Sequence, residues 1–201
     1  MGIAERKIRQ KEEFRTSILE AAWLQVLNDG WQSLSIRKIA DAIEYSIPVI
    51  YNHFENKEAI LLEFTKEGFQ KLADTLLAVK SRYSAPSEQL EAMAHAYWDF
   101  AFEHKEYYQL MFGLGIPACE MVNQIAEMKL MTSVMISTIQ EAIASSNNTE
   151  TNYFLKYHTY LSILHGLVSI EMIQKVGKPD PEKKMILQDA ISGFIKSLVI
   201  N

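Results

Sequence analysis

One stretch decides the fold of this chain: Ser35-Ile36-Arg37-Lys38-Ile39-Ala40-Asp41-Ala42-Ile43-Glu44-Tyr45-Ser46-Ile47-Pro48-Val49-Ile50-Tyr51-Asn52-His53-Phe54-Glu55-Asn56-Lys57-Glu58. Ser35 is a suitable N-cap, and the apolar residues after it recur at helical spacing, at Ile36, Ile39, Ala40 and Ile43. The spacing predicts a short amphipathic helix that buries this stripe. Arg37, Lys38 and Asp41 then face water.

A second short helix is predicted directly after the first. Ser46 offers a new N-cap, and Pro48 falls in the first turn, where its missing N–H group costs nothing. Ile50 and Phe54 share the inward face at i, i+4. The outward residues of the first two turns are then Ile47, Pro48, Val49, Tyr51, Asn52 and His53. Such a mixed apolar and polar surface near a helix N-terminus is typical of a segment that enters the major groove of DNA.

The next helix is predicted to begin after Asn56, which can cap it, with Lys57 close to where a phosphate would meet free helix-end amides. A cap, a turn and another cap also occur in purely structural helix pairs. The helical pattern alone therefore leaves DNA binding open.

At these residues the chain resembles the tetracycline-repressor (TetR) family of bacterial transcription regulators. The matching positions keep the family's spacing over roughly residues 9 to 65: Gly30-Trp31, Ser35, Ile39-Ala40, Ser46, Ile50-Tyr51, His53-Phe54 and Lys57. We expect DNA contacts from Ser35, Arg37, Ser46, Ile47, Pro48, Val49, Tyr51, Asn52, His53 and Lys57.

One position departs from the pattern of that family. Glu44 stands in the turn where the family usually has Gly and where a left-handed backbone is expected. A non-Gly residue in that conformation costs about 1 kcal/mol. We therefore expect a strained but tolerated turn at Glu44.

Composition favours an all-α fold of one large or two small domains. The chain has 201 residues, 48% of them hydrophobic, and only 8 Gly and 5 Pro interrupt long runs of helix-forming residues. The net charge of −5 would argue against nucleic acid, yet a local surface is what meets DNA. The basic residues near the N-terminus supply such a surface: Arg6, Lys7, Arg9, Lys11 and Arg15.

The chain is expected to act in the cytoplasm, because it shows neither a signal peptide nor a long uncharged span. Its one cysteine, Cys119, cannot form an intramolecular disulfide and is expected to be a small apolar filler.

The periodicity and breaks predict nine helices in two domains. Residues 1–56 form a three-helix DNA-binding domain, and residues 57–201 form a helical domain for ligand binding and dimerisation. Outside the stretch quoted above, the predicted helices run over about 10–28, 57–82, 88–103, 107–112, 118–144, 152–176 and 181–200.

The second domain is rich in methionine and aromatic residues, which adapt to ligands of varied shape. A pocket for an apolar or aromatic effector is implied by the resemblance, lined by Met93, Tyr97, Trp98, Phe102, Met111, Met121, Met128, Met135 and His165. The alternative is that these residues are plain core, since apolar stripes at helical spacing usually pack.

The last two helices are expected to pair with those of a second copy, because a major-groove module of this kind usually binds a palindrome through a two-fold dimer. The proposed interface residues are Tyr157, Leu161, Leu164, Val168, Ile186, Ala190, Gly193, Phe194 and Ser197. The alternative is that these faces pack within one chain.

Evidence for a metal or catalytic site is thin. His95 with Asp99 and His158 with His165 are the only arrangements that hint at metal binding or proton transfer, and no metal, cofactor or catalytic residue is predicted.

We therefore predict a dimeric regulator of transcription that binds double-stranded DNA, most simply a repressor released from a pseudo-palindromic operator by a small-molecule effector. One rival is an all-helical enzyme or ligand carrier with a vestigial helix-turn-helix. Another is a regulator whose core is filled and that responds to no ligand.

Overall fold

The computed structural model describes residues 2–113, 125–146, 150–174 and 181–199. Within these ranges the chain forms nine α-helices and a 3₁₀ turn, as predicted: α1 (Ile3–Asp29), η1 (Trp31–Ser33), α2 (Ile36–Ala42), α3 (Ile47–Tyr51), α4 (Lys57–Lys80), α5 (Pro86–Glu103), α6 (Lys105–Met111), α7 (Ala126–Ser145), α8 (Tyr153–Gln174) and α9 (Pro181–Val199). Two residues discussed above, Cys119 and Met121, lie outside the described residues. In the described part, no helix is long and apolar enough to cross a membrane.

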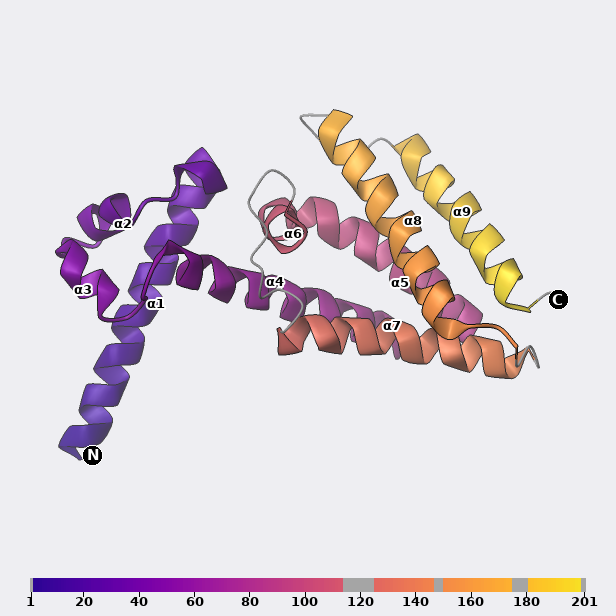
Figure 1. Ribbon diagram of the computed structural model, residues 1–201, viewed down its shortest axis with the longest axis horizontal. Coiled ribbons are helices and arrows are strands. Elements are labelled where there is room, and N and C mark those ends of the chain that lie inside the picture. Colours follow the sequence, from indigo (N-terminus) through magenta and orange to yellow (C-terminus); the bar gives the residue numbers. More distant parts are fainter. Residues whose placement is uncertain (1, 114–124, 147–149, 175–180, 200–201) are drawn as a thin grey trace.

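The helices form two lobes joined by α4 (Figure 1). Helices α1, α2 and α3 make up the N-terminal lobe, and α4 runs from it into the C-terminal lobe, where it packs on α5, α6 and α7. Helices α8 and α9 lie against each other and against α5 and α7. The long helix α4 is therefore the continuous connection between the two lobes.

Helix α1 begins about seven residues earlier than the sequence predicts. At its first turn the Gly2 amide donates to Glu5 Oε2 at 2.9 Å, which caps the helix start. An exposed i, i+4 ion pair between Arg9 and Glu13 (3.5 Å) further supports this segment. Local helix propensity and capping thus extend α1 past the point where its apolar stripe begins, and Figure 1 shows this end projecting away from the lobe.

The core of the N-terminal lobe contains residues of α1 together with Ile39, Ala40, Ile50 and Phe54, which the sequence predicted to face inward. Ile18 and Ala22 of α1 are fully buried. Ile39 of α2 and Ile50 of α3 are buried with them. The first turns of α4 also contact this core, through Phe64 against Trp23 at 5.4 Å between ring centroids. A domain boundary at residue 56 stays a prediction, since α4 packs on both lobes.

Candidate functional site

Helix α3 is packed into the lobe on one side and exposed on the other. Ile50 and Phe54 are buried in the core of the N-terminal lobe, at 0% and 2% exposure. On the exposed side lie Ile47, Pro48, Tyr51 and Asn52, which we call the α3 face. The structure thus brings four of the six residues predicted to project outward onto one solvent-facing surface.

The turn before α3 adopts the predicted left-handed conformation. Glu44 has φ 59°, and the Tyr45 amide donates to the Ala40 carbonyl at 3.0 Å. The Tyr45 ring lies edge-on to Phe14 of α1, 4.6 Å between centroids. Ser35 and Ser46 occupy the N-cap positions of α2 and α3. The turn geometry therefore fixes α3 against α1 despite the missing glycine.

His53 does not project outward as the sequence analysis expected, and neither does Val49, which is half-buried. Helix α3 ends at Tyr51, so the helical spacing no longer applies at residue 53. The His53 ring packs on Phe14 at 4.8 Å. Burial, and then the nearby charges of Lys11 and Arg15, lower the pKa of His53 below its ordinary value.

Arg15 is used inside the lobe and not as a free surface cation. Its guanidinium pairs with Glu63 at 2.8 Å and lies over the Phe54 ring at 4.2 Å. It also donates to the His53 carbonyl at 3.4 Å. Arg15 is therefore not one of the basic side chains available to the duplex. It links α1 to α4 and to the end of the helix-turn-helix.

Two exposed or half-exposed cations lie at the starts of the helices that precede and follow α3. Arg37 lies in the first turn of α2, and Lys57 is the first residue of α4. Neither has an ion-pair partner within the described ranges, whereas Lys38 pairs with Asp29 at 3.4 Å. Asn56 caps α4 as predicted, accepting a hydrogen bond from the Ala59 amide at 2.8 Å. Arg37 and Lys57 are thus available to phosphate groups.

An aromatic cluster that the sequence analysis missed joins the N-terminal lobe to α6. The Trp31 indole N–H donates to the Glu106 carbonyl at 2.8 Å. Trp23 stacks on Tyr107 with 4.3 Å between centroids. The two tryptophans, eight residues apart near the end of α1, were the one indication in the sequence of an aromatic contact here. Helical periodicity alone does not predict that their partner is α6.

Most of the residues predicted to line a ligand pocket are packed core in this structure. Five of them have 0–3% exposure: Met93, Tyr97, Trp98, Met111 and Met135. Phe102, Met128 and His165 keep partial exposure. A pocket formed by these residues therefore stays a prediction.

His165 ends a buried chain of hydrogen bonds between α5, α6 and α8. The Tyr97 and Tyr108 hydroxyls are 3.0 Å apart, and the Tyr108 hydroxyl lies 2.7 Å from His165 Nδ1. Burial lowers the pKa of His165. On its other side, His165 Nε2 lies 3.3 Å from Ser169 Oγ. A neutral His165 can accept a hydrogen bond from the Tyr108 hydroxyl at Nδ1 and donate one through its Nε2–H group.

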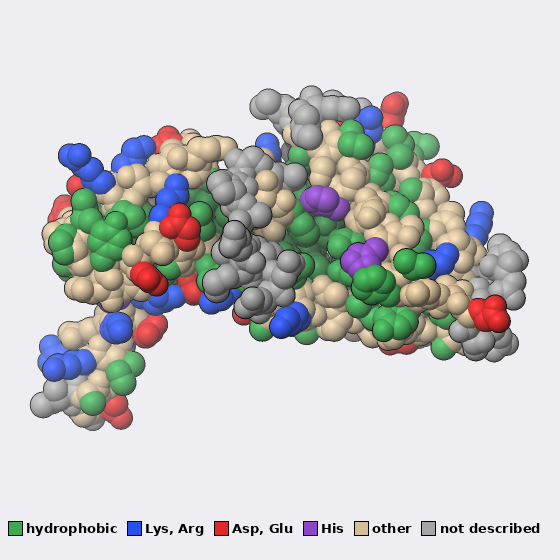
Figure 2. Space-filling view, viewed as in Figure 1, with side chains coloured by type: hydrophobic (Ala, Val, Ile, Leu, Met, Phe, Trp, Pro, Cys, Tyr) green, Lys and Arg blue, Asp and Glu red, His purple; other side chains and the backbone are tan. Residues whose placement is uncertain are grey.

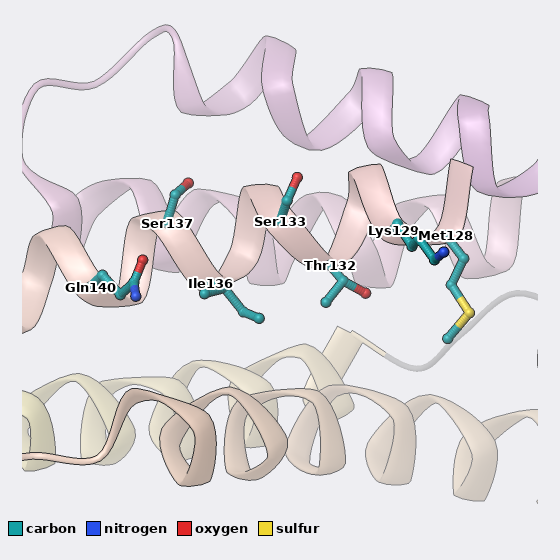
Figure 3. Close-up of a pocket in the computed structure, with 7 residues that line it drawn as sticks. All are labelled: Met128, Lys129, Thr132, Ser133, Ile136, Ser137 and Gln140. Carbon is teal, nitrogen blue, oxygen red and sulfur yellow. The ribbon is translucent and has the colours of Figure 1, made fainter. Parts of the chain in front are cut away.

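An open groove of about 550 Å³ runs along α7. Figure 3 shows Met128, Thr132, Ile136 and Gln140 along one edge of this helix, and Ser133 and Ser137 along the other. Ser137 is 3.3 Å from Lys80 of α4, and Thr132 is 3.2 Å from the Tyr157 hydroxyl of α8. Of the predicted pocket residues that the structure describes, Met128 alone lines this groove.

The predicted dimer residues fall into two groups. Tyr157, Leu164, Val168 and Phe194 are 0–5% exposed within one chain, so they are core residues and cannot be a contact surface for a partner. These four residues belong to the apolar stripes of α8 and α9, which each helix buries within its own lobe. Ile186, Gly193 and Ser197 are exposed, and Leu161 and Ala190 are half-buried.

The residues that hinted at a metal site have other partners. His95 Nε2 is 2.6 Å from Gln188 Oε1, and Asp99 pairs with Lys184 at 2.7 Å. His158 packs on Phe154 at 4.4 Å. In the part of the chain that the structure describes, no group of three His, Cys, Asp or Glu residues could hold a metal ion.

A helix-turn-helix with an exposed second helix, joined by a long helix to a helical lobe, defines a DNA-binding regulator. A model of the bacterial regulatory proteins of the tetR family matches residues 18–64, and one of the tetracyclin repressor-like C-terminal domain matches residues 90–193. The chain therefore belongs to the TetR family of transcription regulators.

Individual relatives agree with this assignment. The chain is 24% identical to the uncharacterized HTH-type transcriptional regulator YobS of Bacillus subtilis over 184 residues, 92% of each protein. It is 26% identical to the uncharacterized regulator YuxN of the same organism over 121 residues, which are 60% of this chain and 40% of YuxN. A structure from Rhodococcus sp. RHA1, of unknown function, has the same fold, with a TM-score of 0.75 and 22% identity over 92% of this chain and 95% of that one.

Proposed function

We propose that this protein is a dimeric repressor that binds a pseudo-palindromic operator and leaves it when a small molecule binds the C-terminal lobe. The observation that carries the proposal is the α3 face. It is exposed and is held by buried Ile50 and Phe54, and the cations Arg37 and Lys57 stand at the starts of the helices before and after α3. Base contacts from a rigid helix, together with phosphate contacts from its neighbours, are what sequence-specific binding requires.

Two variants separate base contacts from phosphate contacts on duplexes selected from a random pool. Asn52→Ala should weaken binding to the selected duplex by about 1 to 3 kcal/mol and leave binding to unrelated DNA unchanged. Lys57→Ala should weaken binding to all duplexes evenly and reduce the log–log salt slope by about one per protomer. If neither variant changes DNA affinity, the α3 face is not the DNA-binding surface.

The dimer is proposed to form through the outer faces of α8 and α9. The exposed apolar residues of these helices lie there: Phe154, Leu155, Ile170, Met185 and Ile186, at 48–71% exposure. Gly166 and Gly193 have open space where a side chain would stand, so a second helix can come close to the backbone at both. An apolar surface with room for close approach favours helix pairing.

The effector is proposed to bind in the C-terminal lobe near the Tyr97–Tyr108–His165 chain, where flexible methionines and aromatic rings can repack around a ligand. Native mass spectrometry of the purified protein can detect a co-purifying small molecule. The compound should raise the melting temperature and lower operator affinity. It can do so only if it binds the DNA-free conformation more tightly than the DNA-bound conformation. A compound that raises operator affinity would contradict release, and loss of the gene should increase transcription from the operator.

A further inference from the structure

The α3 face contains no charged residue. From Ile47 to Phe54 the chain has no Arg, Lys, Asp or Glu. Ile47 and Tyr51 are 38% and 50% exposed, and Pro48 and Asn52 are exposed beside them. Figure 2 shows hydrophobic side chains gathered at the end of the molecule where α2 and α3 lie, with both basic and acidic side chains around them.

This chemistry matches one kind of base pair. In the major groove, guanine is bound best by Arg or Lys, and cytosine donates to Asp or Glu. Thymine presents a C5-methyl group to apolar side chains, and adenine pairs with the amide of Asn or Gln. Guanine placed against Ile47 or Pro48 would lose hydration without gaining a partner.

We propose that the base pairs beneath α3 are A·T pairs. Thymine methyl groups pack on Ile47, Pro48 and the Tyr51 ring, and Asn52 binds an adenine. His53 lies outside the α3 face, because its ring packs on Phe14 just beyond the end of α3. Arg37 lies outside the α3 face, on α2, so a guanine is compatible with the flank of the half-site. The inference rests on the proposed operator binding and specifies the class of operator.

The first step of the test is selection of duplexes from a random pool by the full-length protein. We expect A·T pairs at adjacent positions in the centre of each half-site. Each thymine is then replaced by deoxyuridine, which removes only the methyl group and keeps the base pair. Binding should weaken about fourfold for each methyl that packs on the α3 face. Deoxyuridine outside the half-sites should have no effect.

Ile47→Ala identifies the side chain responsible. Because Ile47 is on the surface, the variant should keep the fold. It should bind thymine and deoxyuridine duplexes equally well at one position of each half-site. Leu24→Ala, at a 60% exposed site on α1, is the matched control and should retain the full sensitivity to deoxyuridine.

Several outcomes overturn the inference. Selection of G·C pairs beneath α3 contradicts it directly. A selected A·T-rich site whose affinity stays within twofold on every deoxyuridine replacement also contradicts it, because the preference would then come from DNA deformability. If the protein enriches no sequence, the proposed function itself fails, and the two failures are thus distinguishable.

Discussion

Glu44 shows at the scale of one residue how a motif can tolerate strain. The sequence predicted a left-handed residue in the turn, and φ of 59° confirms it. The turn persists because its surroundings hold it. Ile39 and Ala40 before it are buried, and Tyr45 after it packs on Phe14.

Glu44→Gly should increase the free energy of unfolding by about 0.5 to 1 kcal/mol, because glycine adopts positive φ without the steric cost. Urea denaturation followed by circular dichroism measures the change. Glu44→Ala is the control, since it removes the carboxylate but keeps the Cβ, and it should give no gain. Equal stabilisation by both variants would show that the gain comes from removal of the Glu44 carboxylate and not from relief of backbone strain.

Val49 and His53 show what helical periodicity could not predict. The pattern assigned the buried residues Ile50 and Phe54 correctly, because apolar spacing reports the inward face. It does not report where α3 ends or what lies beside it. Position 53 follows the last helical residue and faces Phe14, a contact that depends on how α1 crosses α3.

The half-buried His165 should make stability depend on pH. Its pKa in the folded protein is below the ordinary 6.5, so the unfolded chain binds more protons as the pH falls through that value. Stability should therefore decrease between pH 7 and pH 5. His165→Gln, which can still accept from Tyr108, should show a smaller decrease. His158→Gln, at an exposed position on the same helix, is the control, and identical pH profiles for wild type and His165→Gln would contradict the prediction.

At the scale of elements, α6 contacts the N-terminal lobe as well as α4 and α5. Trp31 and Trp23 hold it from the N-terminal lobe, through the Glu106 carbonyl and the Tyr107 ring. Gly68 of α4 lies beneath it, where an added Cβ would stand 2.6 Å from Met111 Sδ. Helical periodicity can show that Gly68 faces inward, but only the fold shows that α6 is its partner.

Gly68→Val should destabilise the protein by about 1 to 3 kcal/mol, because the new side chain overlaps Met111. Met111→Ala makes room for it, so the double variant should lose at least about 1 kcal/mol less than the sum of the two single losses. Urea unfolding of all four proteins gives the coupling. Ala78→Val, exposed on the same helix, measures the effect of valine on helix propensity. Strict additivity would show that α4 and α6 do not touch at this point.

At the scale of the whole molecule, the sequence predicted the helical class and the two-lobed organisation, because caps, breaks and periodicity are local. Four of the residues that it predicted for a dimer interface, Tyr157, Leu164, Val168 and Phe194, are instead buried within one chain, for a physical reason. An apolar stripe reports that a helix is buried, and α8 uses Leu164 and Val168 for its own lobe. The outer face is less regular and includes Gly166, so its pattern gave no comparable signal.

The outer face gives the last prediction, since a palindromic operator needs two recognition helices about 34 Å apart or somewhat more. Gly193→Arg places a long cation where open space now allows close approach of a second helix. If the dimer buries this site, an unpaired charge there costs several kcal/mol. The variant should stay helical, become monomeric and bind a palindrome no better than a single half-site, because it loses the effective concentration of two linked modules.

Gln140→Arg, exposed on α7, should remain dimeric. Light scattering, circular dichroism and binding to full and half operators decide the question, and a folded Gly193→Arg dimer with undiminished operator affinity would place the interface elsewhere.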